Sequence, residues 1–212
     1  MHIPDGFLNI ATVATTYTIS SGGVTYAARE AGKKLGEKHV PLMGIMAAFV
    51  FSAQMLNFPI AGGTSGHLLG AALAAILLGP WGGLLVMACV LIVQCLIFQD
   101  GGLLALGANI FNMGFVGCFL SYYAYVAITK VVGTERKGML VSAFVAAWLS
   151  VFAASVLCVI ELVASGTTPL GVSLPAMAGV HALIGVVEGL ITVAVLSFVL
   201  ATRSDLLSLQ KV

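Results

Sequence analysis

The sequence contains few charged residues. Only 8% of its 212 residues are Asp, Glu, Lys or Arg, whereas 60% are hydrophobic. A soluble domain carries about a quarter charged residues. The formal net charge of +1 leaves no Lys/Arg cluster that could neutralise several phosphates, so nucleic acid is excluded as a partner. The composition indicates an integral membrane protein that is surrounded by lipid bilayer.

Several catalytic and redox motifs are also missing. The four cysteines form no CxxC pair and lie in apolar runs, which argues against disulfides and thiolate zinc sites; they are Cys89, Cys95, Cys118 and Cys158. There is no HExxH motif. The nearest candidate for a phosphate-binding loop has Ala27 in place of its first glycine and Lys34 in place of its Ser or Thr. We therefore expect neither an enzyme nor an ATPase.

The chain is rich in long apolar runs. A helix needs about 20 apolar residues to cross the hydrocarbon core of a bilayer. Six runs of about this kind occur, at 10–29, 41–58, 81–98, 103–130, 139–163 and 177–201. A shorter run at 67–79 is separated from the next one by Gly79-Pro80, so it either crosses by itself or extends the following helix.

The distribution of basic residues decides between these alternatives. All nine Lys and Arg residues fall in the stretches 29–38, 130–137 and 203–211. These stretches share one side of the membrane only if 67–79 crosses separately, and basic loops are typically cytoplasmic. We predict an all-α polytopic membrane protein with seven transmembrane helices in a single domain, 1–212. Its N-terminus is expected outside and its C-terminus in the cytoplasm.

The short helix also predicts a pocket. Its 13 residues would cover about 20 Å of a core about 30 Å thick. The end that carries His67 should then lie within the membrane, after the flexible stretch 59–66. Irregular backbone at this depth must be buried in protein or line a cavity. We therefore expect an outward-facing pocket with His67 at its floor.

The N-terminus offers a chelating set of nitrogens. A metal bound by the Met1 amine and the deprotonated His2 amide closes a five-membered ring, and the His2 imidazole closes a six-membered ring. His67 can supply a fourth nitrogen. Four planar nitrogens suit Ni²⁺ or Cu²⁺ rather than Zn²⁺, Mg²⁺ or Ca²⁺. The alternative is that Met1 is only the initiator residue, His2 a solvated tail residue and His67 a polar residue at a helix start.

Further features favour the metal site. Pro4 and the pair Asp5-Gly6 predict a turn that folds the terminus back, where Phe7 and Leu8 can anchor it. A bulky second residue should protect Met1 from removal, and no basic segment of a cleavable secretion signal precedes the apolar run.

Polar residues within the spans could support the metal ligands. His181 and Glu188 are seven residues apart on one helical face and, with Asn57, can orient the ligands. Interhelical hydrogen bonding is the alternative role. It also applies to the remaining polar residues, Gln54, Gln94, Asn109, Asn112 and Glu161.

Four segments resemble a known family. They are Met-His-Ile-Pro-Asp-Gly-Phe at 1–7 and the stretches 54–70, 100–113 and 181–192. They are similar to the cobalt/nickel substrate-binding (S) components of energy-coupling-factor transporters, the CbiM/NikM family, whose cobalt members serve cobalamin biosynthesis. The resemblance covers most of the chain. Nickel and cobalt members share these motifs.

The resemblance has implications for structure and partners. It implies a metal bound by the Met1 amine, His2 and His67, and an extra N-terminal helix on the six-helix S-component fold. It also implies a transmembrane coupling (T) subunit and two ATPase subunits in a prokaryotic plasma membrane, and allows for a small accessory membrane subunit. The stripe Gly23, Ala27 and Ala31 could dock a coupling subunit or pack within the chain.

The leading hypothesis is therefore capture of Ni²⁺ or Co²⁺ outside the cell for delivery inward with partner subunits. A self-contained carrier or channel is the first alternative, but it would need polar groups along a through-path, and the inner half of 67–79 is only Ala, Ile, Leu and Gly. An intramembrane metalloenzyme is the second. Four nitrogens in one plane leave it no obvious open position for catalysis.

Overall fold

A computed structural model describes residues 1–34 and 39–206 of the chain. Lys38 and Lys211, two of the basic residues used to predict the topology, lie outside the described residues. The elements, in chain order, are α1 (Ile10–Lys34), α2 (His39–Gln54), β1 (Phe58–Pro59), β2 (Ser65–Gly66), α3 (Ala71–Phe98), α4 (Leu106–Asn109), the π-helical stretch η1 (Ile110–Val116), α5 (Gly117–Val132), α6 (Arg136–Ala164), α7 (Leu170–Thr202) and the short 3₁₀ helix η2 (Ser204–Leu206).

The helical, multi-pass character predicted from the sequence is confirmed. In the described part of the chain four helices are long and apolar enough to cross a membrane: α3, the continuous run from α4 to α5, α6 and α7. The apolar helix α2 is shorter, with 16 residues. The helix α1 covers the first predicted span, but several Thr and Ser residues make it less apolar. The two strands contain two residues each.

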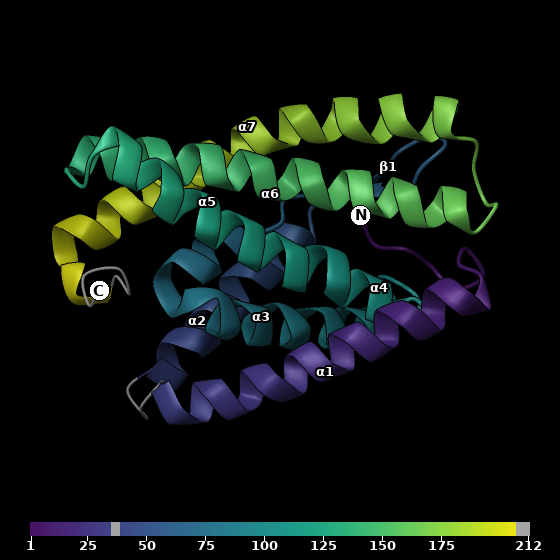
Figure 1. Ribbon diagram of the computed structural model, residues 1–212, viewed down its shortest axis with the longest axis horizontal. Helices are drawn as coiled ribbons and strands as arrows, with labels where there is room; N and C mark the ends of the chain where they lie inside the picture. Colours follow the sequence, from purple (N-terminus) through teal and green to yellow (C-terminus); the bar gives the residue numbers. More distant parts are fainter. Residues whose placement is uncertain (35–38, 207–212) are drawn as a thin grey trace.

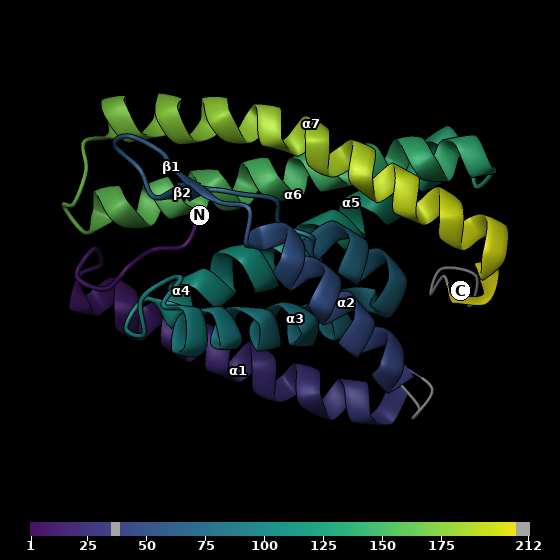
Figure 2. The same ribbon diagram turned by 180° about the vertical axis from the view of Figure 1, so that it is seen from behind.

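The helices lie on two sides of the N-terminal segment. On one side α6 and α7 run antiparallel next to each other, and on the other side lie α1, α3 and α4 (Figures 1 and 2). The N-terminus reaches into the space between them (Figure 1). Met1 and Ile3 belong to the same buried apolar cluster as Leu84, Met113 and Leu162. The first residues of the chain are thus part of the hydrophobic core.

The helix α3 is divided by a sharp reversal at Gly79, whose backbone is non-helical at φ 75° and ψ 166°. A methyl group on Gly83 would lie 3.0 Å from the backbone of Ala75. In a straight helix, residues eight positions apart are separated by about 12 Å. The segment 71–78 therefore folds back against 80–98 and does not extend it.

This short segment begins later than predicted. Its first helical residue is Ala71, not His67. The preceding residue Gly70 adopts a positive φ of 77°, and the Glu188 carboxylate accepts hydrogen bonds from the N–H groups of Leu69 and Gly70. Both features separate His67 from the helix. Likewise, α2 ends at Gln54, before the predicted boundary at 58.

The small-residue stripe of α1 packs within the chain at two of its three positions. A methyl group on Gly23 would lie 3.1 Å from the Phe115 ring, and Ala27 is fully buried. Internal packing, the second of the two roles considered for this stripe, accounts for both residues.

Candidate metal site

Residues 1–8, which we call the N-terminal strap, are held by bonds to the loop and helix that follow α3. The backbone of Ile3 pairs twice with the Asn109 side chain, as Ile3 N–H to Oδ1 (2.8 Å) and Nδ2–H to Ile3 O (3.1 Å). Gly102 N–H also donates to Ile3 O at 2.8 Å. The Asp5 carboxylate accepts from the N–H groups of Leu103 (3.0 Å) and Leu104 (2.7 Å). These bonds fix the depth of the strap.

The predicted turn in the strap is present. Asp5 and Gly6 form a turn in which Gly6 has a φ of 84°. Phe7 and Leu8 pack against the main hydrophobic core, and the Phe7 carbonyl accepts from Thr167 Oγ1. The strap is therefore anchored at both ends, and the anchor at Phe7 and Leu8 is the one that the sequence predicted.

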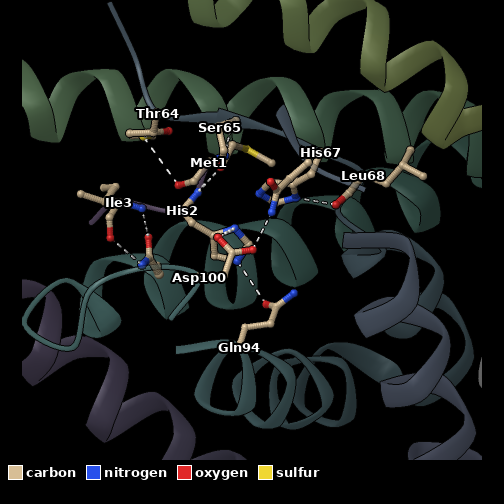
Figure 3. Close-up of polar contacts among 12 residues, drawn as sticks. Met1, His2, Ile3, Thr64, Ser65, His67, Leu68, Gln94 and Asp100 are labelled. Carbon is tan, nitrogen blue, oxygen red and sulfur yellow. Dashed lines mark hydrogen bonds and ion pairs between the residues drawn. The ribbon is translucent and has the colours of Figure 1, made fainter. Parts of the chain in front are cut away.

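The Met1 amine is buried against Ser65. It donates to the Ser65 carbonyl and, at 2.8 Å, to Ser65 Oγ. The next backbone nitrogen, His2 N–H, donates to the same Oγ at 3.1 Å (Figure 3). Burial, which disfavours the charged form, lowers the pKa of the Met1 amine to about 5. At neutral pH the amine is therefore uncharged and carries a lone pair.

The His2 ring is oriented by one of its two nitrogens. Nε2 lies 3.1 Å from Gln94 Oε1, and because this oxygen only accepts, Nε2 carries the proton. Nδ1 has no hydrogen-bond partner within the described residues and lies 3.3 Å from Asp100 Oδ1. Burial, followed by the nearby Met1 amine, lowers the pKa of His2 to about 3. An unprotonated Nδ1 is thus available beside the amine.

The His67 ring is oriented in the complementary way. Its Nδ1–H donates to Leu68 O at 2.7 Å, which leaves Nε2 unprotonated. Nε2 is buried and without a hydrogen-bond partner in the described part of the chain. The ring stacks on that of His2, with 4.5 Å between centroids and 28° between planes. The structure therefore brings together all three predicted ligand residues, Met1, His2 and His67 (Figure 3).

The three predicted supporting residues make different contacts. Glu188 accepts from Leu69 N–H (2.9 Å) and Gly70 N–H (2.6 Å), so it holds the backbone that follows His67. Asn57 Nδ2 donates to Asp100 Oδ2 at 2.7 Å and so positions the carboxylate beside His2. His181 Nδ1–H donates to a carbonyl of its own helix at 2.7 Å, and its Nε2 is unpartnered among the described residues.

Sequence reasoning missed several residues that shape this site. Ser65 and Asp100 lie in segments that carry the family resemblance, but no pattern in the sequence gives them a role, and none predicts the contacts of Asp5 and Asn109. Gln94 and Asn109 were noted only as polar residues in apolar spans. Asn112 does make an interhelical bond of the kind considered, to Glu161 Oε2 at 2.6 Å.

The donor set depends on backbone nitrogens. Among the described residues, no three His, Cys, Asp or Glu side chains are grouped so as to hold a metal ion. The four cysteines are unpaired, as predicted. The groups that could hold a metal here are the two histidines, with the Met1 amine and the His2 amide as backbone donors beside them.

Comparisons with known proteins agree on one family. The family described as "CbiM: Cobalt uptake substrate-specific transmembrane region" matches residues 2–206. A putative fused nickel transport protein, NikMN, of Archaeoglobus fulgidus is 46% identical over 209 residues, which cover 98% of this chain and 68% of the relative. The cobalt transport protein CbiM 1 of Pelobacter propionicus is 35% identical, with 99% and 96% covered.

A solved structure has the same fold. The crystal structure of a truncated transition metal transporter superimposes with a TM-score of 0.88 and 36% identity, over 95% of this chain and 99% of that one.

Proposed function

The chain belongs to the CbiM family of cobalt-uptake transmembrane proteins, and we propose that it captures Ni²⁺ or Co²⁺ outside the cell as transported substrate. It is a membrane transport protein and not an enzyme. The substrate is held by the Met1 amine, the His2 amide, His2 Nδ1 and His67 Nε2. Residues 1–212 form one metal-binding unit.

The observation that carries this proposal is the state of the two imidazoles. Each ring uses one nitrogen for a hydrogen bond, His2 Nε2 to Gln94 and His67 Nδ1 to Leu68, and each leaves the other nitrogen buried without a hydrogen-bond partner among the described residues. The free nitrogens are those that the chelate requires. Only Nδ1 of His2 can close a six-membered ring with the amide of the same residue.

The geometry favours a planar set. The amine, the amide and His2 Nδ1 occupy three corners of a square, and His67 Nε2 occupies the fourth, adjacent to His2 Nδ1. Two rings with centroids 4.5 Å apart fit ligands on adjacent corners, whose nitrogens would be about 3 Å apart around a metal with bonds of about 2 Å. Ni²⁺ prefers such a tetragonal nitrogen site. Glu188 holds the backbone that follows His67, Asn57 positions Asp100 beside the site, and His181 lies on the same α7 face as Glu188.

We further propose that the chain is the substrate-binding component of an energy-coupling-factor importer in a prokaryotic cell membrane. Its partners would be a transmembrane coupling subunit and two ATPase subunits, and the resemblance also allows a small accessory membrane subunit as a further partner. It crosses the bilayer seven times, with the N-terminus outside and the C-terminus in the cytoplasm. The reversal at Gly79 supports counting the stretch 67–79 separately from the span 81–98.

A self-contained carrier is the less supported alternative. Residues 71–78 are all buried and apolar, so on the cytoplasmic side of His67 this segment supplies no polar side chain to a permeation path. A binding component needs no such path in its resting state, since release would follow a rearrangement with its partners.

Titration calorimetry of the purified chain with Ni²⁺, Co²⁺, Cu²⁺ and Zn²⁺, combined with visible spectra, tests the proposed function. A square-planar Ni²⁺ complex should be diamagnetic and yellow-orange. His67→Ala should weaken Ni²⁺ binding by at least the roughly 10- to 100-fold typical of changes around metal ligands. His39→Ala, at the start of α2 and outside the site, is the matched control. Equal Ni²⁺ affinity of the two variants would rule out the proposed site.

A further inference from the structure

The hydroxyl of Ser65 lies between the two backbone nitrogens that the proposed function assigns to the substrate. Its Oγ is 2.8 Å from the Met1 amine and 3.1 Å from the His2 amide nitrogen. It accepts a hydrogen bond from both (Figure 3). A five-membered chelate ring would place the metal between these same two nitrogens.

The hydroxyl and the metal cannot both occupy this position. Coordination replaces the proton of the His2 amide, so the metal lies close to the direction of the former N–H bond, about 2 Å from the nitrogen. The N–H group now points at Ser65 Oγ. A metal there would lie within about 2 Å of Oγ, a bonding or shorter distance. Ser65 must therefore either become a ligand or move away.

We propose that the Ser65 hydroxyl is a placeholder for the substrate. In the metal-free protein it keeps the amine and the amide directed at the centre of the site, and it rotates away when Ni²⁺ or Co²⁺ arrives. The inference rests on the proposed function and assigns this residue a role in it. Four nitrogens already complete the square plane, so no corner is left for an oxygen ligand.

The surroundings of Ser65 suit a side-chain rotation with a fixed backbone. Ser65 lies in β2 and pairs with Pro59 of β1. The Ser65 carbonyl accepts a separate bond from the Met1 amine, which does not require the hydroxyl. The amine needs only to turn about its own N–Cα bond to direct its lone pair into the vacated position.

The placeholder has a definite thermodynamic consequence. Its two hydrogen bonds exist only in the metal-free protein, so deleting the hydroxyl raises the free energy of that state alone. Substrate binding then becomes tighter. Two hydrogen bonds of ordinary net strength correspond to a gain of roughly 5- to 150-fold in affinity. Disorder of the strap in the variant would reduce this gain but could not reverse its sign, because the disordered state is equally accessible to the unmodified chain.

The test compares Ser65→Ala with Ser142→Ala in the full chain. Ser142 is also buried, and its hydroxyl donates to a carbonyl of its own helix, Gly138, at 2.8 Å. By calorimetry Ser65→Ala should bind Ni²⁺ more tightly than the unmodified chain, with an unchanged visible spectrum. Without metal, the thermal midpoint of Ser65→Ala should be lower than that of the unmodified chain. With Ni²⁺ bound to both, the two midpoints should be equal. Weaker or unchanged Ni²⁺ binding would overturn the placeholder, and an altered spectrum would make Ser65 a ligand.

A structure of the unmodified chain with Ni²⁺ bound decides the matter if Ser65→Ala does not fold. Ser65 Oγ should no longer lie within hydrogen-bond distance of the His2 nitrogen, nor bond to the metal. Either contact would refute the inference while leaving the nitrogen ligands intact. A chain that binds no Ni²⁺ at all would instead refute the proposed function.

Discussion

Gly102→Ala should weaken Ni²⁺ binding although Gly102 contacts no proposed ligand atom. A methyl group at this position would lie 2.2 Å from both the backbone nitrogen and Oδ1 of Asp5. Atoms cannot approach this closely, so the strap must shift. The shift breaks the bonds from Leu103 and Leu104 to the Asp5 carboxylate and the bond from Gly102 N–H to Ile3.

The size of the effect follows from these bonds. A hydrogen bond to a charged group contributes about 1.5–3 kcal/mol, and because Asp5 is exposed to solvent we take about 2–3 kcal/mol for both bonds together. This changes the equilibrium between docked and undocked strap by roughly 30- to 150-fold. Since only the docked strap presents Met1 and His2, the apparent affinity for Ni²⁺ falls by up to this factor.

The assay is Ni²⁺ titration calorimetry against Gly22→Ala. Gly22 lies in α1 with no heavy atom within 4 Å of the position of an added methyl group. This control should bind Ni²⁺ like the unmodified chain. If Gly102→Ala binds Ni²⁺ as tightly as Gly22→Ala, docking of the strap through Asp5 does not control the site.

Three further predictions follow from other parts of the structure. Burial lowers the pKa of the Met1 amine to about 5 and the pKa of His2 to about 3, so both groups are already unprotonated between about pH 6 and pH 8. In this range Ni²⁺ binding should release about one proton, from the His2 amide, and the affinity for Ni²⁺ should rise about tenfold per pH unit. Calorimetry in buffers of different ionisation enthalpy counts the protons, and a second proton would show an amine at its ordinary pKa of 8.0. Glu188→Gln replaces one acceptor oxygen with a donor and should weaken Ni²⁺ binding by about tenfold, because Leu69 or Gly70 N–H loses its partner; unchanged affinity would show that Glu188 does not position His67. A cysteine placed between α5 and α6, at 133–135, should not react with an impermeant reagent in intact cells, and labelling there would contradict the seven-crossing topology.

The sequence predicted the helices well because long apolar runs leave a chain in a membrane few other ways to satisfy its backbone groups. The break at Gly79-Pro80 was also visible, since these residue types interrupt helices. The start of the short helix at Ala71 was not, because it depends on Glu188 of α7. That contact joins positions more than a hundred residues apart, and local pattern does not encode it.

Met1 and His2 were predictable from chelate chemistry because they are neighbours in the chain, and His67 was predictable from the depth of the short apolar run 67–79. Their surroundings were not. The bonds of Asn109 to Ile3 and of Gln94 to His2 connect distant segments through side chains of ordinary type. Ser65 is a similar case, since a serine in a glycine-rich stretch has no pattern that points to the chain terminus. Only the folded arrangement brings it to the amine.

The central claim is that the Met1 amine itself binds the substrate, and a single added residue tests it most directly. Placing one alanine before Met1 turns the amine into an amide and removes the fused chelate rings, although every side chain of the site remains. Ni²⁺ titration and the visible spectrum of this extended protein should show a large loss of affinity and loss of the yellow-orange square-planar signal. If the extended protein binds Ni²⁺ as tightly as the native chain, with the same spectrum, the amine is not a ligand and the proposed site is wrong.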